Sequence, residues 1–542
     1  MSSEAKKNLK KNVLVQGSIL AVASIIVRLI GLFYRIPMTR ILGDKAMGYY
    51  SYAFEIYNLA LILSSYSIPL SVSKLVSARI VKGETKNAHK VFRFTMVLSG
   101  VVGAIMTLLV VLLAESYGKL INSPNVAIPL KVLAPTIFVF SVMGVIRGYF
   151  QGQNNMVPTA ISQIVEQIFN AIVSILASYC MLRAFAHKTN AEAYGAAGGT
   201  MGTFIGAVSA LVTLIFIYCL SRNRIHDELK NDTSNYDEEY AHILKILLVT
   251  AIPVIISQTI YQISGTLDSV IYNRAVSAKG VSEAVRSAHW GIYSNKYRLL
   301  SNVPVAVASA MGTAVVPSLI AEYVMGNYEA MKRKIASVVK FNMIIAFPSA
   351  IGLSVLARPI LLLLFGDGNV ISERMLQIGG ICVVFFALST VTNGVLQGID
   401  RMDLPVKHSA ISLIIHIPVL FLLLKFTDLD SYALVICNVM FPLVVCILNW
   451  RSIGKLIDYK QEVVKTFIIP LIASILMGAA GFAVYILIKP LGNTIDTCIS
   501  VLVCIVVYFF FLTKLKGVTR EEMLAMPRGK RLVKVLTKLH FF

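Results

Sequence analysis

Charged side chains are scarce in this chain, since only 14% of its 542 residues are Asp, Glu, Lys or Arg. A soluble domain carries about 25% of such residues. Hydrophobic residues make up 56% of the chain and the mean hydropathy is +0.74, which excludes a string of soluble domains. Because a membrane-spanning helix needs about 20 apolar residues, the sequence predicts an all-α polytopic membrane protein with about fourteen spans.

Patterns of known catalytic and metal sites are also lacking. The seven cysteines lie in apolar segments without a CxxC pair, which is typical of small core residues. No HExxH, Ser-His-Asp or nucleotide-binding pattern stands out. We therefore expect no enzyme activity, no bound metal and no resident cofactor.

The positive charge is unevenly distributed along the chain. The formal net charge is +22, which by itself would suit nucleic acid. Lys and Arg instead gather in alternate loops between the predicted spans, beginning with the N-terminal segment. Such a bias marks the cytoplasmic side of a membrane protein. We therefore expect both termini in the cytoplasm, contacts with membrane lipids and no nucleic-acid partner.

The predicted spans fall into two lobes with an appendage. The spans are 13–42, 46–77, 91–114, 126–150, 158–184, 195–220, 241–273, 286–323, 335–357, 374–397, 405–426, 431–453, 465–488 and 493–514. The predicted regions are an N-terminal lobe (1–220), a cytoplasmic linker (221–240), a C-terminal lobe (241–454), two extra helices (455–514) and a basic cytoplasmic tail (515–542). Each lobe contains six spans.

An internal repeat supports the two lobes. The segment 148–158 (GYFQGQNNMVP) returns as 394–405 (GVLQGIDRMDLP), and 78–83 (ARIVKG) returns as 321–326 (AEYVMG). An even number of spans separates the copies, so the lobes have the same orientation. Transporters with such parallel repeats have their binding site between the lobes.

The first predicted span carries cations where the membrane is apolar. Its polar or small face contains Gly17, Ala21, Ser24, Arg28, Gly31 and Arg35. An Arg near the bilayer centre costs about 2.5–3.5 kcal/mol, so it must face protein or water. Guanidinium groups bind phosphate or carboxylate with two hydrogen bonds, so we interpret Arg28 as an anion ligand. An ion pair with Glu55 is the alternative for Arg28, and snorkelling toward the outer surface is the alternative for Arg35.

Further polar residues inside the predicted spans complete the candidate site. The candidate substrate ligands are Arg28, Arg35, Arg298, Lys296, Glu55, Asn58 and Asn295, and the candidates for ion coupling are Asp268, Glu55 and Glu166. The repeat pairs the first two spans with the seventh and eighth, so Arg28 and Arg298 would face one another. A helix-packing role is an equally good interpretation of Glu166. Arg147 is interpreted as an anchor at the cytoplasmic surface, and 365–369 (FGDGN) as an external turn.

The segments 27–43 (VRLIGLFYRIPMTRILG) and 310–326 (AMGTAVVPSLIAEYVMG), with the paired Gly-x-x-Gln-Gly loops, resemble the MOP exporter superfamily. The chain looks most similar to its polysaccharide-transporter branch, which includes the MurJ-type lipid II flippases and the SpoVB-like proteins. The resemblance covers the whole chain. It implies two six-helix lobes plus two helices, and alternating-access export of a polyprenyl-diphosphate-linked glycan across the bacterial cytoplasmic membrane.

The resemblance also implies a role for two arginines. Those matching Arg28 and Arg298 lie in the central cavity of the family, where the diphosphate would sit. The favoured substrate is lipid II for peptidoglycan synthesis, with cell-wall synthesis enzymes as further candidate partners. Another lipid-linked polysaccharide unit and a cation-coupled multidrug antiporter remain alternatives. Gly48, Leu61 and His416 depart from patterns in the family, which leaves coupling to Na+, H+ or the membrane potential open.

Overall fold

The computed structural model of the protein describes residues 3–232, 234, 236–488, 492–519, 522 and 533, and every regular element among them is a helix. The chain divides into two compact units, Met1–Gly291 (unit 1) and Ile292–Phe542 (unit 2). The all-α polytopic fold predicted from the composition is thus confirmed. Most of the predicted basic tail lies outside the described residues.

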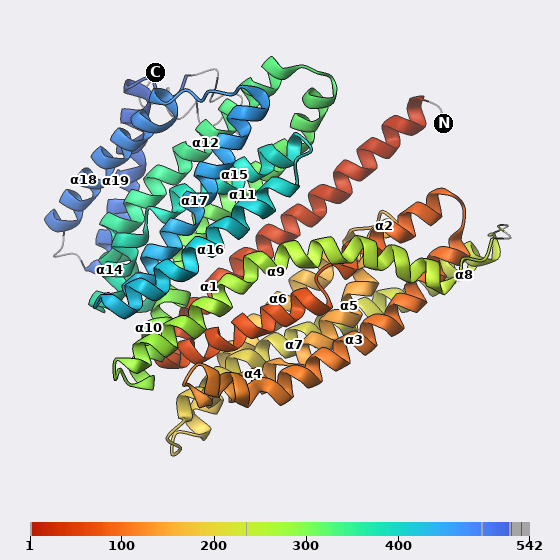
Figure 1. The fold of residues 1–542 in the computed structure, drawn as a ribbon, viewed down its shortest axis with the longest axis horizontal. Helices are drawn as coiled ribbons and strands as arrows, with labels where there is room; N and C mark the ends of the chain where they lie inside the picture. Colours follow the sequence, from red (N-terminus) through yellow and green to blue (C-terminus); the bar gives the residue numbers. More distant parts are fainter. Residues whose placement is uncertain are drawn as a thin grey trace. The chain divides into compact units, whose positions relative to one another are not determined.

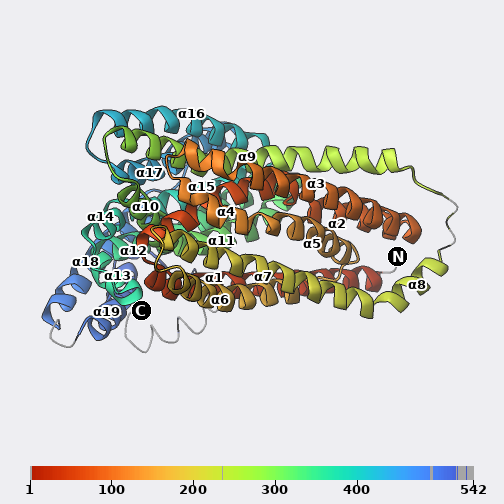
Figure 2. The same cartoon turned by 90° about the horizontal axis from the view of Figure 1, so that it is seen from below.

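Unit 1 consists of helices joined by turns and by one longer segment between α8 and α9 (Figure 1). They are α1 (Ser3–Ser64), α2 (Ile68–Val81), α3 (Thr85–Leu120), η1 (Pro124–Val126), α4 (Ala127–Leu133), α5 (Pro135–Gly152), α6 (Val157–Ala184), α7 (Ala191–Leu220), α8 (Arg222–Lys230), α9 (Tyr240–Ala278) and α10 (Glu283–Ile292), whose last residue begins unit 2. Helices α2, α3 and α5 lie side by side (Figure 1, Figure 2). Buried Val72, Val91 and Phe150 of these helices form part of one apolar core.

Helix α1 reverses its direction at Gly43. Sixteen residues of straight helix span about 24 Å, yet the hydroxyl oxygens of Tyr34 and Tyr50 lie 3.4 Å apart. Gly43 has φ 75° and ψ 171°, a left-handed conformation that favours glycine. Helix α1 is therefore a hairpin. Its first arm corresponds to the predicted span 13–42, and its second arm with α2 corresponds to 46–77.

The number of spans follows from this hairpin. Among the described residues, twelve helices are long and apolar enough to cross a membrane, or thirteen if the bent pair Val370–Gly379 and Cys382–Gly398 is one span. The predicted fourteen are recovered when the bent pair counts as one span and Ser18–Val81 counts as the two predicted spans that it covers. Large apolar side chains such as Leu112 (64% exposed) point outward, as lipid-facing residues do.

Helices α9 and α10 pack within unit 1. A Cβ atom on Gly48 would collide with the Ser287 backbone carbonyl, so α1 and α10 cross in direct backbone contact. The rings of Tyr52 and Trp290 stack beside this crossing with centroids 5.0 Å apart. The sequence repeat places the lobe boundary at the linker, before α9, whereas packing places α9 and α10 with the first unit. The compact units thus differ from the predicted lobes, and the two-lobe division stays a prediction.

The linker lies against the turn between α2 and α3. The buried Arg79 side chain donates through Nε to Glu238 Oε2 at 2.5 Å. Asn87 Oδ1 accepts from the Glu238 backbone N–H at 3.1 Å. The Lys86 backbone N–H donates to Asp232 Oδ2 at 2.6 Å and holds the pKa of that carboxyl below its usual range. These bonds fix the chain just before α9 begins.

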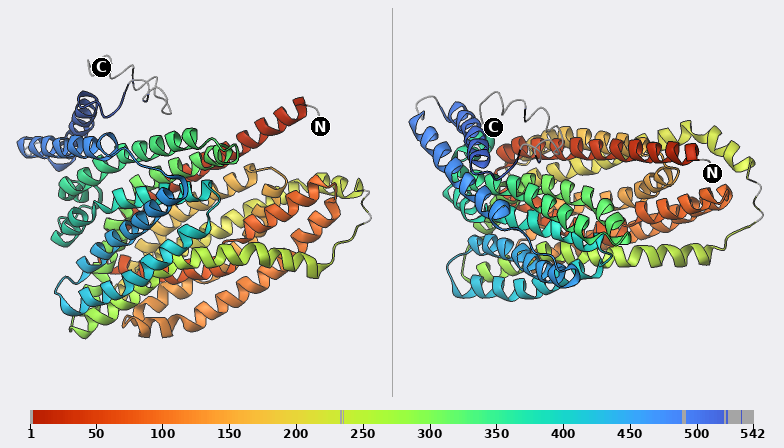
Figure 3. Two further views of the ribbon diagram at one scale, coloured as in Figure 1. Left: turned by 45° about the horizontal axis from the view of Figure 1, so that its top comes forward. Right: turned by 90° about the horizontal axis from the view of Figure 1, so that it is seen from above.

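Unit 2 begins with a π-helix and contains the remaining spans. Its helices are η2 (Tyr293–Tyr297, π), α11 (Arg298–Val324), α12 (Tyr328–Val355), α13 (Ala357–Phe365), α14 (Val370–Gly379), α15 (Cys382–Gly398), α16 (Asp403–Phe426), α17 (Ser431–Ile457), η3 (Val464–Ile468, π), α18 (Ile469–Leu487) and α19 (Asn493–Lys514). Helices α18 and α19, the predicted extra pair, lie side by side (Figure 1, Figure 3) and α18 packs on α12.

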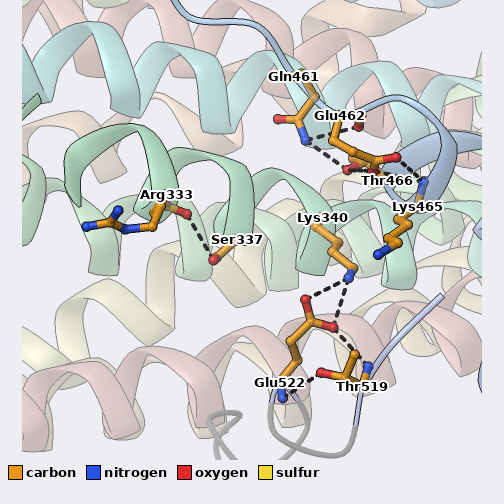
Figure 4. A network of polar contacts seen from close by, with 9 residues as sticks. All are labelled: Arg333, Ser337, Lys340, Gln461, Glu462, Lys465, Thr466, Thr519 and Glu522. Carbon is orange, nitrogen blue, oxygen red and sulfur yellow. Dashed lines mark hydrogen bonds and ion pairs between the residues drawn. The ribbon is translucent and has the colours of Figure 1, made fainter. Parts of the chain in front are cut away.

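The described part of the C-terminal tail returns to α12. Lys340 is 8% exposed, and its Nζ donates to both carboxylate oxygens of Glu522 at 2.8 Å (Figure 4). Glu522 also accepts from the Thr519 backbone N–H at 2.9 Å, and the Thr519 hydroxyl accepts from the Glu522 N–H at 3.3 Å. This reciprocal pattern is a capping box. The chain after α19 is thereby tied to unit 2.

Candidate functional site

The cation Arg28 lies on the exposed side of the first arm of α1. Its neighbours Ile25 and Leu29 are also exposed, at 56% and 48%. Among the described residues, no hydrogen bond or ion pair reaches the Arg28 side chain, and Glu55 is not its partner. A charge in such surroundings is unfavourable unless a ligand, lipid head group or water solvates it.

Arg35, by contrast, is held inside the α1 hairpin. It is half-buried. Its guanidinium interacts with the hydroxyls of Tyr34 and Tyr50, one from each arm. These tyrosines lie beside its charged end, and the snorkelling alternative for Arg35 stays open. Whether it also contacts a substrate stays a prediction.

The first arm of α1 packs against α6, with Gly31 near a polar residue of α6. A Cβ atom on Gly31 would lie 3.9 Å from Gln167 Oε1, and Gln16 Oε1 accepts from the Met156 backbone N–H at 2.9 Å. The buried Oε1 atoms of Gln163 and Gln167 have no hydrogen-bond partner among the described residues. An unsatisfied buried acceptor costs about 1–3 kcal/mol, and each such group needs a donor from water or a ligand.

Glu55 lies on the second arm of α1, in contact with α9. Its side chain is 7% exposed, and Gln262 Nε2 donates to Glu55 Oε2 at 3.3 Å. A Cβ atom on Gly265 would collide with the same carboxylate, so the glycine provides its space. Asp268, one turn further along α9, is 6% exposed, and Asn58 is half-buried one turn after Glu55. The structure thus brings polar residues of the predicted second and seventh spans together.

Glu166 forms an ion pair between α5 and α6. Arg147 Nη2 lies 2.9 Å from Glu166 Oε2, and Arg147 Nε donates to Ser162 Oγ at 3.0 Å. Arg147 is only 8% exposed, so its interpretation as a surface anchor is wrong. The side chain is a buried connector between two helices. A coupling role for Glu166 stays a prediction and would require this pair to open.

In unit 2, the candidate residues follow one another on the π-helix η2 and the start of α11. Asn295 and Lys296 are 2% and 3% exposed. Arg298 is half-buried, with its guanidinium carbon 5.8 Å from the centroid of the Tyr293 ring. A π-helix shifts the facing of side chains and is frequent at functional sites. The apolar periodicity of the sequence gave no indication of it.

Lys296 forms an ion pair with Asp367. The turn that contains Asp367 holds its carboxylate in position, because Asp367 Oδ1 accepts from the Asn369 N–H at 2.9 Å. Gly366 ends α13 just before it in a left-handed conformation. The predicted turn at 365–369 is therefore present. Its Asp was not recognised as a partner of Lys296, because nothing in the sequence links positions 71 residues apart. The convergence of Arg28 with Arg298 stays a prediction.

Among the described residues, no group of three or more His, Cys, Asp or Glu side chains could hold a metal ion. Buried His416 contacts Phe441 edge to face, with ring centroids 6.0 Å apart.

Comparisons with known proteins agree with the fold. The chain is 24% identical over 476 residues to "Lipid II flippase MurJ" of Bacillus subtilis (strain 168), which covers 85% of this chain and 86% of the relative. The solved structure of a lipid II flippase MurJ in an inward closed conformation matches with TM-score 0.63 and 15% identity, covering 92% of this chain and 98% of that chain. An inward-facing multidrug resistance MATE transporter of the MOP superfamily matches with TM-score 0.65 and 15% identity, covering 82% and 98%.

Two family profiles match the chain. The profile described as "Polysaccharide biosynthesis protein" matches residues 13–323, and that described as "MatE" matches residues 297–422. The relatives described above are named as a flippase or a transporter. The resemblance to the MOP exporters is confirmed. Since the first profile spans more than half of the chain, the protein belongs to the polysaccharide biosynthesis protein family.

Proposed function

We propose that the protein is an alternating-access flippase for undecaprenyl-diphosphate-linked sugars, with lipid II as the favoured substrate. The observation that carries this proposal is Arg28. Its guanidinium is exposed on an apolar span without an ion pair among the described residues. A diphosphate supplies the two adjacent anionic oxygens that a guanidinium binds best.

Other polar residues support the binding of a glycan head group. The unsatisfied oxygens of Gln163 and Gln167, on the helix that packs against α1, would accept hydrogen bonds from sugar hydroxyls. Arg298 is the second cation that we assign to the diphosphate, and Arg35, Lys296, Asn295, Asn58 and Glu55 are assigned to its surroundings. The lipid tail would remain in the bilayer during transport.

The distribution of Lys and Arg gives the orientation in the membrane, and acidic residues within the spans are the candidates for ion coupling. We assign both termini to the cytoplasmic side of a bacterial cytoplasmic membrane, where each Lys or Arg near the surface attracts anionic lipid by about 1 kcal/mol. Na+, H+ or the membrane potential would supply the energy, and Asp268, Glu55 and Glu166 are candidate coupling residues. Cell-wall synthesis enzymes are candidate partners that consume the delivered glycan.

The proposal is tested in proteoliposomes with defined fluorescent lipid-linked sugars. We expect Arg28→Ala and Arg298→Ala to abolish flipping, and Arg28→Lys to restore it only partly, since Lys lacks the planar fork. Arg333→Ala removes one charge from an exposed part of α12 (Figure 4) and serves as the matched control with wild-type rates. Wild-type flipping by folded Arg28→Ala protein would refute the diphosphate role of Arg28.

A cation-coupled multidrug antiporter is the second candidate, favoured by the MatE match over 297–422. Such a site should favour carboxylates, because its drugs are usually cations. Binding of a cationic dye is therefore compared with binding of a polyprenyl diphosphate. Tight binding of the dye that the diphosphate does not displace would favour the antiporter. A set of lipid-linked glycans in the same assay separates lipid II from other polysaccharide units.

A further inference from the structure

Helices α1 and α10 cross through a reciprocal backbone contact. A Cβ atom on Gly48 would collide with the carbonyl oxygen of Ser287, and a Cβ atom on Gly291 would collide with that of Asp44. In the sequence, 287 follows 44 by 243 positions, and 291 follows 48 by the same 243. This is also the separation between the two copies of the repeat at 78–83. Equivalent residues contact one another reciprocally only where a two-fold axis relates the two segments.

Glycines elsewhere repeat their packing with nearly the same separation. In unit 1, a Cβ atom on Gly148 would lie 2.8 Å from the carbonyl oxygen of Pro69. In unit 2, a Cβ atom on Gly394 would lie 3.1 Å from the carbonyl oxygen of Gly312. The two glycines are 246 positions apart and their partners 243 positions apart, as in the sequence repeat. A second pair of equivalent contacts is Gly152 with Val76 and Gly398 with Leu319. Positions related by the repeat therefore make related contacts.

The α1–α10 crossing joins segments that the repeat assigns to different copies. The second arm of α1 belongs to the predicted N-terminal lobe, whereas α10 belongs to the predicted C-terminal lobe. Small residues allow two helix backbones to approach closely, and at Gly48 and Gly291 the backbones meet directly. Because a glycine has no side chain that interlocks with the facing helix, the two surfaces can separate at these positions without repacking of side chains.

Glu283, the first residue of α10, accepts three hydrogen bonds beside this crossing. Its Oε1 atom accepts from the Tyr49 hydroxyl at 3.3 Å, from Ser123 Oγ at 2.8 Å and from Asn125 Nδ2 at 3.5 Å. All three donors lie in the predicted N-terminal lobe, and no described ion pair includes Glu283. Hydrogen bonds to a carboxylate are stronger than those between neutral groups. The Glu283 carboxylate thus holds α10 against α1 and against the turn after α3.

The crossing also buries polar atoms that lack a partner. Arg286 and Ser287 are 4% and 0% exposed. Among the described residues, Arg286 Nε and Ser287 Oγ have no hydrogen-bond partner, although Arg286 Nη2 donates to the Asn122 carbonyl oxygen at 2.8 Å. Buried polar atoms of a permanent core are nearly always hydrogen-bonded, and one left without a partner destabilises the state that buries it. Water would reach both atoms if the crossing opened, so their burial favours opening and opposes Glu283.

We propose that the α1–α10 crossing is the contact at which the two repeat copies close against each other, and that Glu283 locks it. That the crossing opens during each transport cycle rests on the proposed function. The crossing lies near the Gly43 turn, at the predicted external end of the first two spans, so its opening would expose a substrate to the outside. A change that weakens only the closed conformation shifts the equilibrium toward the open one.

Thiol labelling of the full chain in lipid nanodiscs tests the lock without transport. Ser287→Cys places a thiol inside the crossing, and mass spectrometry of the peptide that contains residue 287 measures its reaction with a maleimide. We expect Glu283→Ala to raise the labelling rate about tenfold, because hydrogen bonds to a charged acceptor are lost, and Glu283→Gln to raise it less. Glu192→Ala is the matched control, because it removes a carboxylate that pairs with Lys45 inside one predicted lobe, and it should leave the rate unchanged. Equal labelling rates with Glu283 and with Ala at this position overturn the lock.

Cross-linking in proteoliposomes tests the opening. Ser123→Cys with Glu283→Cys joins the two repeat copies, and Lys45→Cys with Glu192→Cys joins two positions of one copy whose side chains are similarly close, at 3.2 Å. A short bifunctional thiol reagent that a reductant cleaves is applied to both double variants and to the wild type. We expect the first cross-link to abolish flipping of lipid-linked sugars until the reductant is added, and the second to leave the rate unchanged.

Two results of this assay would count against opening. Flipping at the untreated rate by the cross-linked Ser123→Cys, Glu283→Cys protein would show that the crossing stays closed throughout transport, which overturns the opening. If the wild type flips no lipid-linked sugar, the proposed function fails and the opening fails with it. The labelling of residue 287 still decides whether Glu283 locks the crossing.

Discussion

Arg79 and Glu238 form an ion pair in which both side chains are nearly buried, at 7% and 4% exposed. Glu238→Gln would leave the guanidinium without its counter-charge. Breaking such a pair costs about 3–5 kcal/mol. We expect the opening free energy measured by amide hydrogen exchange at residue 238 to fall by a large part of this amount.

The neighbouring pair Lys90–Asp237 provides the control, because Asp237 is 84% exposed. An exposed pair contributes about 0–1 kcal/mol. Asp237→Asn should therefore change amide exchange very little. Equal effects of the two substitutions would show that burial does not determine the strength of the linker contact.

The pH response of the linker has a definite direction. The pKa of Asp232 is lowered in the folded state, chiefly by the Lys86 backbone N–H. Its contribution to stability is complete above the unfolded pKa of about 3.9 and is lost only as pH falls through the folded value. We expect the contribution of Asp232, measured as the difference in linker proteolysis between wild type and Asp232→Asn, to be constant from pH 5 to 8. A contribution that falls across this range would contradict the prediction.

Gly43→Ala is expected to destabilise the α1 hairpin. A Cβ atom would meet nothing within 4 Å, so the whole effect comes from the positive φ of 75°. A non-glycine residue held in such a conformation costs about 1–3 kcal/mol. Thermal unfolding in detergent should show a lower midpoint for Gly43→Ala. Gly100→Ala, at a helical glycine of α3 with nothing within 4 Å, should leave the midpoint equal or higher.

Asp367→Asn is expected to destabilise unit 2 through Lys296. The ammonium is 3% exposed and would lose its carboxylate, which costs about 3–5 kcal/mol for a buried pair. The double variant Lys296→Met with Asp367→Asn also removes the positive charge of Lys296, so it should recover most of the thermal stability. If Asp367→Asn alone unfolds at the wild-type temperature, the pair does not stabilise the fold.

The sequence predicted the elements that depend on local chemistry. Apolar length and turn residues located the spans, the break near Gly43 and the turn at 365–369. Polar residues inside apolar segments pointed to Glu55 and Asp268, and the structure joins Glu55 to Gln262 on the helix of Asp268 at 3.3 Å. Helical spacing also grouped Arg28 with Gly31 on one face.

The remaining features depend on distant partners. The periodicity of a sequence does not say which helix packs against α1, so the contact of α1 with α6 was not predicted. The pairing of Lys296 with Asp367 and of Arg147 with Glu166 requires the tertiary fold. The π-helix at Tyr293–Tyr297 differs from an α-helix by one hydrogen-bond step, and apolar patterning does not resolve such a difference.

The backbone crossing at Gly48 has a consequence for dividing the protein into pieces. The linker is the natural place to cut between the two predicted lobes. A cut there would nevertheless leave α9 and α10 on the fragment that lacks α1, with the Glu55 carboxylate and the Gly48 surface uncovered. The fragments 1–240 and 241–542 should therefore depend on co-expression for solubility in detergent, and they form a complementation pair rather than two independent domains.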